Sequence, residues 1–299
     1  MELTEEINRL KAERQAIIVA HNYQVDDVQE IADYTGDSYF LSKICAKNEA
    51  KTIVFCGVRF MAESAKLLSP EKTVLLPEAT AGCPMADSMT PEDVIRLKNE
   101  HPKAAVVCYI NSTVDVKAEC DVCCTSSNAL KVIHSLKEEE VIFIPDPNLG
   151  DYVSKQVPEK KFYFFNGPCV THSRVSIEEI KKARKLSPGA PIAVHPECPP
   201  EVVAAADYVG STSGIVDFCR NSDAKCIVIG TEMGILYQLK KDCPDKEFRL
   251  LTPRLLCVNM KKTSLESVYH ALRDNKTQIE INSTAADKAR LSLERMLRA

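Results

Sequence analysis

The sequence lacks several features that would place the protein in a particular functional class. It has no basic run and no basic stripe studded with aromatics, and its net charge of −4 comes from interspersed acids and bases, so a nucleic-acid partner is not expected. No apolar stretch approaches the ~18 residues of a transmembrane helix. The first residues also lack the basic and apolar regions of a signal peptide. We therefore expect a cytoplasmic protein with neither nucleic acid nor membrane among its partners.

Glycine is scarce, with 10 residues in a chain of 299, while 45% of the residues are hydrophobic. Such a chain can bury a large core and should contain more than one folding unit. No low-complexity linker separates the units, so we expect them to pack tightly. The 13 cysteines are an odd number, and in a reducing compartment they indicate buried thiols and metal ligands rather than a disulfide framework.

One order of structural signals occurs three times along the chain. Each copy has an apolar strand, a polar cluster, a helix and a small-residue turn, and the copies begin at AIIVAHNYQ, AVVCYINST and PIAVHPECP. Their landmarks keep one spacing, since Asp33, Asp121 and Asp207 are separated by 88 and then 86 residues. Two further strands recur, as TIVFCG, VIFIPD and CIVIGT and as KTVLLPEATAGC, KKFYFFNGPC and KEFRLLTPRLLC. Each copy therefore predicts about three strands.

The helices also recur, and three of them begin with a capping-box pattern: TPED at Thr90, SIEE at Ser176 and TSLE at Thr263. Strands that alternate with helices predict parallel sheets covered on both faces. We expect an α/β fold of three pseudo-symmetric three-layer α/β/α domains, at residues 1–86, 87–172 and 173–259. Residues 260–299 predict a helix, a short strand at QIEIN and a last helix, which should pack back on the first domain.

Three cysteines occupy equivalent positions in the copies. Cys83, Cys169 and Cys257 are 86 and 88 residues apart, and each directly follows the third strand of its copy. Equivalent points in three pseudo-symmetric domains lie around a common axis, so the three sulfurs can converge on it. A [4Fe–4S] cluster has a three-fold axis through one iron, and three thiolates leave that iron without a protein ligand. We therefore predict a central [4Fe–4S] cluster whose open iron acts as a Lewis acid.

The cysteines also permit other sites. Zinc held by the same three cysteines and a water remains possible, because catalytic zinc keeps an open position. Cys120, Cys123 and Cys124 contain a Cys-x-x-Cys spacing, but the other two copies fill these positions without cysteine. Small buried residues at a tight turn are the better interpretation there. Cys198 stands in a polar cluster and could be a redox-sensitive neighbour of the centre.

Unusual polar residues follow the first strand of each copy, where the carboxyl ends of parallel strands collect ligands. They are His21, Asn22 and Tyr23 in the first copy, Tyr109, Asn111 and Ser112 in the second, and His195 and Glu197 in the third. A second equivalent set, Ser38, Ser126 and Thr212, follows small-residue turns and precedes helices. These hydroxyls either cap the helices or face, with the helix N-termini, a multiply anionic substrate.

Taken together, these residues resemble the quinolinate synthase family (quinolinate synthase A, short form) over essentially the whole chain. The matching stretches are AHNYQ, EIADYTGDS, CPMAD, YINST, TSSNA, PDPNLGDYV, VHPECP, DYVGSTSG, IGTEMG and CVNMKK. The resemblance implies that iminoaspartate (iminosuccinate) and dihydroxyacetone phosphate condense to quinolinate, with loss of phosphate and two waters, in de novo NAD biosynthesis. One departure is minor: Pro168 stands where other members often have a histidine.

The resemblance also implies roles for individual residues. The cluster ligands would be Cys83, Cys169 and Cys257, and iminoaspartate would bind to His21, Ser38, Tyr109, Asn111, Ser126, His195, Glu197 and Thr212. Among these, Glu197 is our candidate general base with His195 beside it, and Tyr109 and Tyr23 are candidate acids.

The resemblance further suggests a functional coupling to an aspartate oxidase or dehydrogenase that produces iminoaspartate. Two other functions remain open, another cluster-dependent hydro-lyase and a non-catalytic iron–sulfur sensor. A radical enzyme is disfavoured because the sequence has no Cys-x-x-x-Cys-x-x-Cys run.

Overall fold

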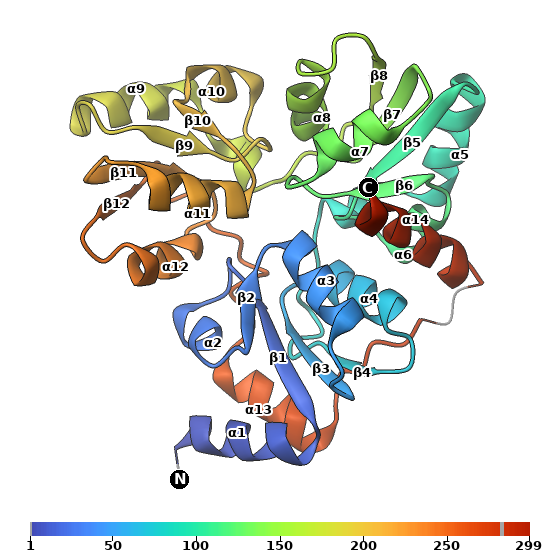
Figure 1. The fold of residues 1–299 in the computed structure, drawn as a ribbon, viewed down its shortest axis with the longest axis vertical. Helices are drawn as coiled ribbons and strands as arrows, with labels where there is room; N and C mark the ends of the chain where they lie inside the picture. Colours follow the sequence, from blue (N-terminus) through green and yellow to red (C-terminus); the bar gives the residue numbers. More distant parts are fainter. Residues whose placement is uncertain (1, 282–283) are drawn as a thin grey trace.

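The structure is a computed structural model that describes residues 2–281 and 284–299. Three four-stranded parallel sheets form three lobes that meet at the centre of the molecule (Figure 1). The first sheet contains β1 (Ala16–His21), β2 (Tyr34–Gly36), β3 (Thr52–Cys56) and β4 (Thr73–Leu75). The second contains β5 (Ala104–Tyr109), β6 (Val122–Cys124), β7 (Glu140–Ile144) and β8 (Lys161–Phe164). The third contains β9 (Ile192–Val194), β10 (Tyr208–Val209), β11 (Cys226–Gly230) and β12 (Glu247–Leu250).

The three sheets share one strand order. The orders are β2-β1-β3-β4, β6-β5-β7-β8 and β10-β9-β11-β12, and every pairing is parallel. This confirms the predicted α/β class with three pseudo-symmetric units. The prediction of about three strands per copy is wrong by one. The additional strands β2, β6 and β10 are only two or three residues long, too short to show a period of alternating side chains.

The recurring aspartates join these short strands to the first strand of each unit. The Asp33 amide donates to the Ile18 carbonyl at 2.8 Å, and Asp33 Oδ2 accepts the Ile18 amide at 2.8 Å. The same pair of contacts links Asp121 to Val106 and Asp207 to Ile192. The spacing of 88 and 86 residues thus marks a structural contact that fixes the edge strand.

Helices cover both faces of each sheet (Figure 1). The first unit has α1 (Leu3–Glu13), α2 (Asp26–Glu30), α3 (Ser38–Lys47) and α4 (Arg59–Leu68). The second has α5 (Pro91–Glu100), α6 (Val114–Ala118), α7 (Ala129–Ser135) and α8 (Pro147–Ser154). The third has α9 (Ile177–Leu186), α10 (Pro200–Ala205), α11 (Thr212–Asn221) and α12 (Ile235–Asp242). Over residues 2–281 and 284–299, no helix has the length and apolarity needed to span a membrane.

A lysine anchors the C-terminal end of one helix in each unit. Lys72 Nζ donates to the Cys45 carbonyl at 3.0 Å at the end of α3. Lys160 and Lys246 make the same kind of contact with Leu136 O at 3.0 Å and Ser222 O at 2.6 Å, at the ends of α7 and α11. A cation at this end also complements the helix dipole. The lysines therefore fix the C-terminal ends of the three helices, whose N-termini point toward the centre of the molecule.

Two of the three predicted capping boxes are confirmed. Thr90 and Ser176 cap α5 and α9, with Asp93 and Glu179 completing the reciprocal bonds. The third prediction is wrong by one residue, because Ser264 rather than Thr263 caps α13 (Leu265–Asp274). The reciprocal bond there comes from a second serine three positions on rather than from a glutamate, a pair that the capping-box pattern does not include.

The tail contacts two units. α13 packs against α1 and β3 of the first unit. The strand predicted at QIEIN is reduced to one antiparallel bridge between Gln278 and Leu75, and Asn282 at its end lies outside the described residues. α14 (Ala286–Arg298) packs against α6 and β6 of the second unit and against α4 of the first. The predicted domain boundaries stay predictions.

The cysteines of the Cys-x-x-Cys segment lie in the core. Cys120, Cys123 and Cys124 are buried, and Cys123 Sγ lies 3.3 Å from Ser292 Oγ under α14. This confirms that the group consists of small buried residues, but Cys123 and Cys124 lie in β6 rather than at a tight turn. Cys198 is also buried, with its sulfur 3.6 Å from the Gly230 carbonyl oxygen.

Candidate active site

The carboxyl ends of strands from the three sheets surround one cavity of about 80 Å³. All the residues proposed from the sequence as cluster ligands, substrate contacts or proton donors and acceptors line this cavity. They are His21, Tyr23, Ser38, Cys83, Tyr109, Asn111, Ser126, Cys169, His195, Glu197, Thr212 and Cys257. The structure therefore brings the whole candidate set together, while the role of each member stays a prediction.

Each of the three cysteines begins a tight loop whose backbone amides turn back toward its own sulfur. In every loop the amide of the residue three positions further on donates to the sulfur; the pairs are Ala86 with Cys83, His172 with Cys169, and Met260 with Cys257. Amide hydrogen bonds to sulfur favour the thiolate form, which is the form that binds a metal. The repeat has thus preserved a loop geometry suited to metal ligation.

Burial opposes ionisation of these thiols as long as they have no cation. It raises the pKa of Cys83 to about 12 and the pKa of Cys169 well above its usual range, and it also raises the pKa of Cys257. The sulfurs are close enough for Cys257 to raise the pKa of Cys83, and for Cys83 to raise that of Cys169. A bound metal group would remove this penalty by deprotonating the thiols. Three convergent thiols therefore fit a cluster held by three cysteines.

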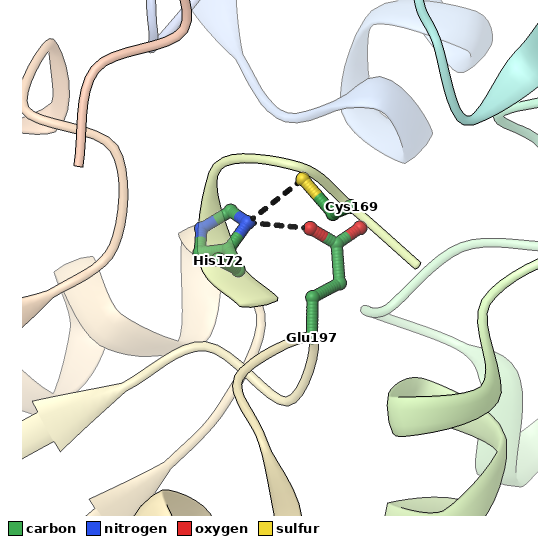
Figure 2. A group of neighbouring side chains, drawn as sticks. All are labelled: Cys169, His172 and Glu197. Carbon is green, nitrogen blue, oxygen red and sulfur yellow. Dashed lines mark hydrogen bonds and ion pairs between the residues drawn. The ribbon is translucent and has the colours of Figure 1, made fainter. Parts of the chain in front are cut away.

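A second donor set lies at the edge of the same site. Figure 2 shows Cys169, His172 and Glu197 pointing toward one another, and their ligand atoms all lie within 4.8 Å of each other. His172 Nδ1 is 2.6 Å from Glu197 Oε2 and 3.3 Å from Cys169 Sγ. Thiolate, imidazole and carboxylate are the donors that zinc accepts. We call these three residues the Cys-His-Glu group.

Sequence reasoning missed His172, although it stands three residues after a proposed ligand. The equivalent positions in the other copies are Ala86 and Met260, so a search for recurring residues passes over it. A search for any metal-ligating residue near the three cysteines would have found it.

Glu197 lies at the centre of a buried polar network. Its side chain accepts hydrogen bonds from the Tyr109 hydroxyl and the His172 ring, and His195 Nδ1 is 3.6 Å from its carboxylate. Burial alone would raise the pKa of Glu197, but the two imidazoles and the tyrosine hydroxyl outweigh burial and hold the pKa below its usual range. Glu197 is therefore an anionic hydrogen-bond acceptor inside the cavity wall.

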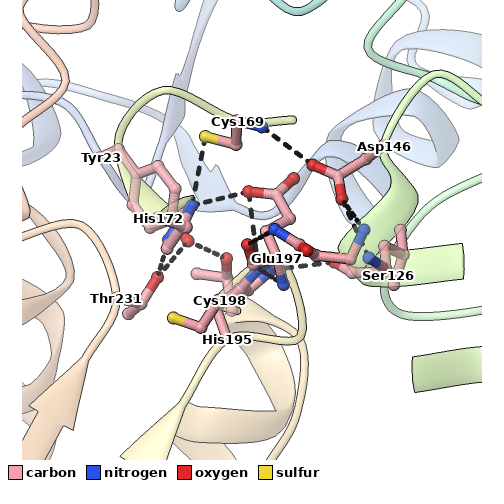
Figure 3. A network of polar contacts seen from close by, with 12 residues as sticks. Tyr23, Ser126, Asp146, Cys169, His172, His195, Glu197, Cys198 and Thr231 are labelled. Atoms are coloured by element: carbon pink, nitrogen blue, oxygen red, sulfur yellow. Dashed lines mark hydrogen bonds and ion pairs between the residues drawn. The ribbon is translucent and has the colours of Figure 1, made fainter. Parts of the chain in front are cut away.

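A chain of short contacts connects Glu197 to Tyr23 across the site (Figure 3). Tyr23 Oη lies 2.6 Å from Thr231 Oγ1, and Thr231 Oγ1 lies 2.9 Å from His172 Nε2. His172 Nδ1 then completes the chain to Glu197. The chain joins two residues proposed from the sequence as base and acid through two that sequence reasoning missed, and hydroxyl and imidazole groups in such a chain can pass a proton.

His21 and His195 have the same hydrogen-bonding pattern. In each, Nδ1 accepts the backbone amide two residues further on, from Tyr23 at 3.1 Å and from Glu197 at 3.3 Å. Burial lowers the pKa of His21 to about 4 and that of His195 to about 3. Both rings are therefore neutral at physiological pH and keep their proton on Nε2. His195 Nε2 lies 3.2 Å from Ser126 Oγ, so it can donate to this hydroxyl.

The hydroxyls of Ser38, Ser126 and Thr212 do not cap the helices. Asp37 caps α3 and Ser211 caps α11, each one residue earlier, and α7 begins only at Ala129. The capping alternative for these three hydroxyls is therefore wrong. Their side chains line the cavity beside helix N-termini that favour anions, with Ser126 Oγ against His195 Nε2 and Thr212 Oγ1 2.8 Å from Tyr23 Oη.

One carboxylate connects all three units near these helix starts. Asp37 Oδ2, in the first unit, accepts hydrogen bonds from Ser127 Oγ of the second unit and Ser213 Oγ of the third, the latter at 2.6 Å. The two serine oxygens are 3.3 Å apart. We call these three residues the Asp37 clamp, because they tie together the helix ends that line the cavity.

Comparisons with known proteins agree with this geometry. The family model described as quinolinate synthetase A protein matches residues 5–298. A protein of Caldicellulosiruptor bescii named quinolinate synthase is 55% identical over 99% of this chain and 97% of its own length. Proteins of the same name from Alkaliphilus metalliredigens and Clostridium kluyveri (strain ATCC 8527 / DSM 555 / NBRC 12016 / NCIMB 10680 / K1) are 52% and 50% identical over the same shares. The chain therefore belongs to the quinolinate synthase family.

Proposed function

We propose that the protein is the enzyme that condenses iminoaspartate with dihydroxyacetone phosphate to quinolinate, with loss of phosphate and two waters, in de novo NAD biosynthesis. One observation carries this proposal: three repeat-equivalent cysteines, each on a loop with amides directed at its sulfur, line the same cavity as polar side chains from all three units. The names of the relatives support the product.

The cofactor that suits these donors is a [4Fe–4S] cluster held by Cys83, Cys169 and Cys257. When bound, it would supply an iron without a protein ligand, a Lewis acid that takes a substrate oxygen and helps a hydroxyl group leave. The ten other cysteines do not line the cavity. No other cysteine among those described here competes for the role.

Substrate binding follows from the donors that face the cavity. Iminoaspartate carries two carboxylates, and the hydroxyls of Ser38, Ser126 and Thr212 lie beside three helix N-termini that attract anions. The neutral His21 ring adds a donating N–H group. Asn111 Oδ1 is buried and has no hydrogen-bond partner among the described residues. A buried acceptor without a partner is costly, and the N–H of the substrate would satisfy it.

Proton transfer follows from the network around Glu197. Its carboxylate is anionic and buried, so it can accept a proton from a substrate carbon beside a carbonyl group. The chain through His172 and Thr231 leads to the hydroxyl of Tyr23, which can protonate a leaving oxygen. Tyr109 donates to the same carboxylate and is the second candidate acid. Ring formation needs several such proton shifts, and this arrangement provides a base and two acids within one cavity.

The proposal is tested by assembling the enzyme without oxygen and measuring iron, sulfide and product. Iminoaspartate is unstable and would be generated in the assay by an aspartate oxidase or dehydrogenase, the enzymes to which we expect a functional coupling. We expect about four irons and four sulfides per chain and quinolinate formation without any partner macromolecule.

The three single variants Cys83→Ala, Cys169→Ala and Cys257→Ala should each lose the cluster and the activity. Cys123→Ala, which removes a core thiol outside the cavity, is the matched control and should keep both. A cluster that survives the three ligand substitutions would refute the proposed ligands. A loaded protein that forms no quinolinate would instead favour an iron–sulfur sensor or another hydro-lyase.

A further inference from the structure

We propose that Asp146 and Glu232 are positioning residues that hold two of the three cluster cysteines in place, and that the third cysteine lacks this support. The proposal rests on the cluster site described under the proposed function. It concerns two buried carboxylates for which neither the sequence patterns nor the family comparison gave a role.

The two carboxylates make the same contact with two cysteine loops. Asp146 Oδ2 accepts the backbone amide of Cys169 at 3.0 Å, a contact visible in Figure 3. Glu232 Oε1 accepts the backbone amide of Cys257, also at 3.0 Å. Both side chains are completely buried, with 0% exposure. In such surroundings a hydrogen bond is strong, because water cannot replace it.

The second oxygen of each carboxylate fixes it to the scaffold. Asp146 Oδ1 accepts the amides of Asn148 and Leu149 at 2.8 and 2.9 Å and so caps α8. Glu232 Oε2 accepts the Gly234 amide at 2.7 Å, directly before α12, and pairs with Lys261 Nζ at 3.0 Å. Each carboxylate therefore ties a cysteine loop to the start of a helix.

The repeat shows that one unit lacks this device. Val58, Asp146 and Glu232 are separated by 88 and 86 residues, the spacing of the other equivalent positions. Val58 and Asp146 directly precede α4 and α8, and Glu232 lies three residues before α12, which in each unit is the helix after the third strand. Val58 has no side-chain acceptor, so the Cys83 loop cannot be held in this way. The three ligands of the cluster are thus supported unequally.

This contact has consequences for a bound cluster. Outer contacts that orient a metal ligand typically contribute 10- to 100-fold in metal affinity. Charge and hydrogen bonding close to a cluster also set its reduction potential. Replacing the acceptor oxygen by an NH₂ group turns the positive end of the amide dipole toward the cysteine loop, and this should make the potential more positive, because the reduced cluster carries one more electron.

Amide substitutions test the contact without removing the helix cap. In Asp146→Asn, the side-chain oxygen can still cap α8, while the new NH₂ group faces the N–H of Cys169, so that two donors oppose each other. Glu232→Gln creates the same conflict at Cys257. Asp121→Asn is the matched control, because Asp121 also accepts a backbone amide, from Val106 at 2.8 Å, but lines a separate pocket that contains none of the cysteine loops.

The experiment compares anaerobically reconstituted wild type with these three variants. The readouts are the rate of iron transfer to a ferrous chelator, the electron paramagnetic resonance spectrum of the reduced cluster and its reduction potential. We expect Asp146→Asn and Glu232→Gln to release iron roughly 10- to 100-fold faster, with changed spectra and more positive potentials, while Asp121→Asn behaves like wild type.

Thermal melting of the metal-free proteins separates a folding defect from a cluster defect. If Asp146→Asn fails to fold, Glu232→Gln decides alone. Wild-type release rates, spectra and potentials in folded Asp146→Asn and Glu232→Gln proteins would overturn the inference. A wild-type protein that takes up no cluster would overturn the proposed function itself, and the two failures are therefore distinguishable.

Discussion

The Asp37 clamp predicts how strongly the three units depend on each other at the cavity. In the double variant Ser127→Ala/Ser213→Ala, both hydroxyl donors to Asp37 Oδ2 are lost. The carboxylate itself remains, and its other oxygen still accepts the Phe40 amide at 2.8 Å as the cap of α3. The variant therefore removes the contacts between units without removing the helix cap.

The size of the effect can be estimated from these two bonds. A hydrogen bond to a charged group contributes about 1.5–3 kcal/mol. Ser127 is exposed and Ser213 is half-buried, so water can replace part of each bond, and the lower value applies. We therefore expect a loss of about 3 kcal/mol in total. For a chain of this size, 1 kcal/mol corresponds to roughly 2–4 °C in melting temperature, which gives a decrease of roughly 6 °C or more.

The assay combines melting of the metal-free protein with steady-state kinetics of the loaded enzyme. Without the clamp, the helix N-termini that line the cavity should be less firmly positioned and should bind the substrate more weakly. KM for iminoaspartate should therefore rise by a larger factor than kcat falls. Ser135→Ala is the control, because among the described residues Ser135 Oγ donates to the Val132 carbonyl of its own helix alone. A loss of 1 kcal/mol should lower the melting temperature by at least ~2 °C. If the double variant melted within about 1 °C of this control and kept the wild-type KM, the Asp37 clamp would be a surface contact without function.

Three further predictions concern single positions. His172→Phe keeps an aromatic ring but breaks the chain of contacts to Glu197, so kcat should fall by a factor of about 10²–10⁴ while the iron content stays unchanged. Loss of iron instead would make His172 a ligand. Metal-free protein should bind Zn²⁺ at the Cys-His-Glu group. In competition with a chelator, His172→Phe should then lose Zn²⁺ affinity at least roughly tenfold, whereas Cys83→Ala should keep it. Equal losses in the two variants would indicate that the three cysteines bind the zinc. The Arg184 ion pair, aided by the Ile192 amide and opposed by burial, holds the pKa of Asp207 below its usual value. The ionised Asp207 therefore stabilises the fold above the unfolded pKa of about 3.9, and this stabilisation is lost as the pH falls through the lower folded pKa. Asp207→Asn should lower the midpoint of urea unfolding at pH 7 and lower it much less near pH 3. Equal decreases at the two pH values would contradict this.

Repetition in the sequence explains why so much of the fold could be predicted. Features that recur with the same residue type, such as Asp33 and its equivalents or Cys83 and its equivalents, are visible at one spacing. They fixed the number of units, their parallel sheets and the set of residues that meet at the cavity. The short edge strands escaped because two or three residues carry no periodicity.

Residues that break the repeat were harder to find. Asp146 and Glu232 share a charge but not an identity, and Val58 takes the third position. A comparison by chemical type rather than by residue would have found two of the three. Thr231 could not be found in this way, because its contact with Tyr23 joins residues 208 positions apart in different units, and no local pattern encodes such a pairing.

The position of α14 has a consequence for the order in which the protein matures. This helix follows all twelve described strands in the chain, yet it covers α6 and β6 of the second unit, which are made much earlier. During synthesis the second unit must therefore wait with part of its core uncovered until the end of the chain arrives. Its cysteine loop also depends on chain that is made later, because His172 contacts Thr231 and Glu197 of the third unit. We expect insertion of the proposed cluster to follow completion of the chain rather than to accompany it.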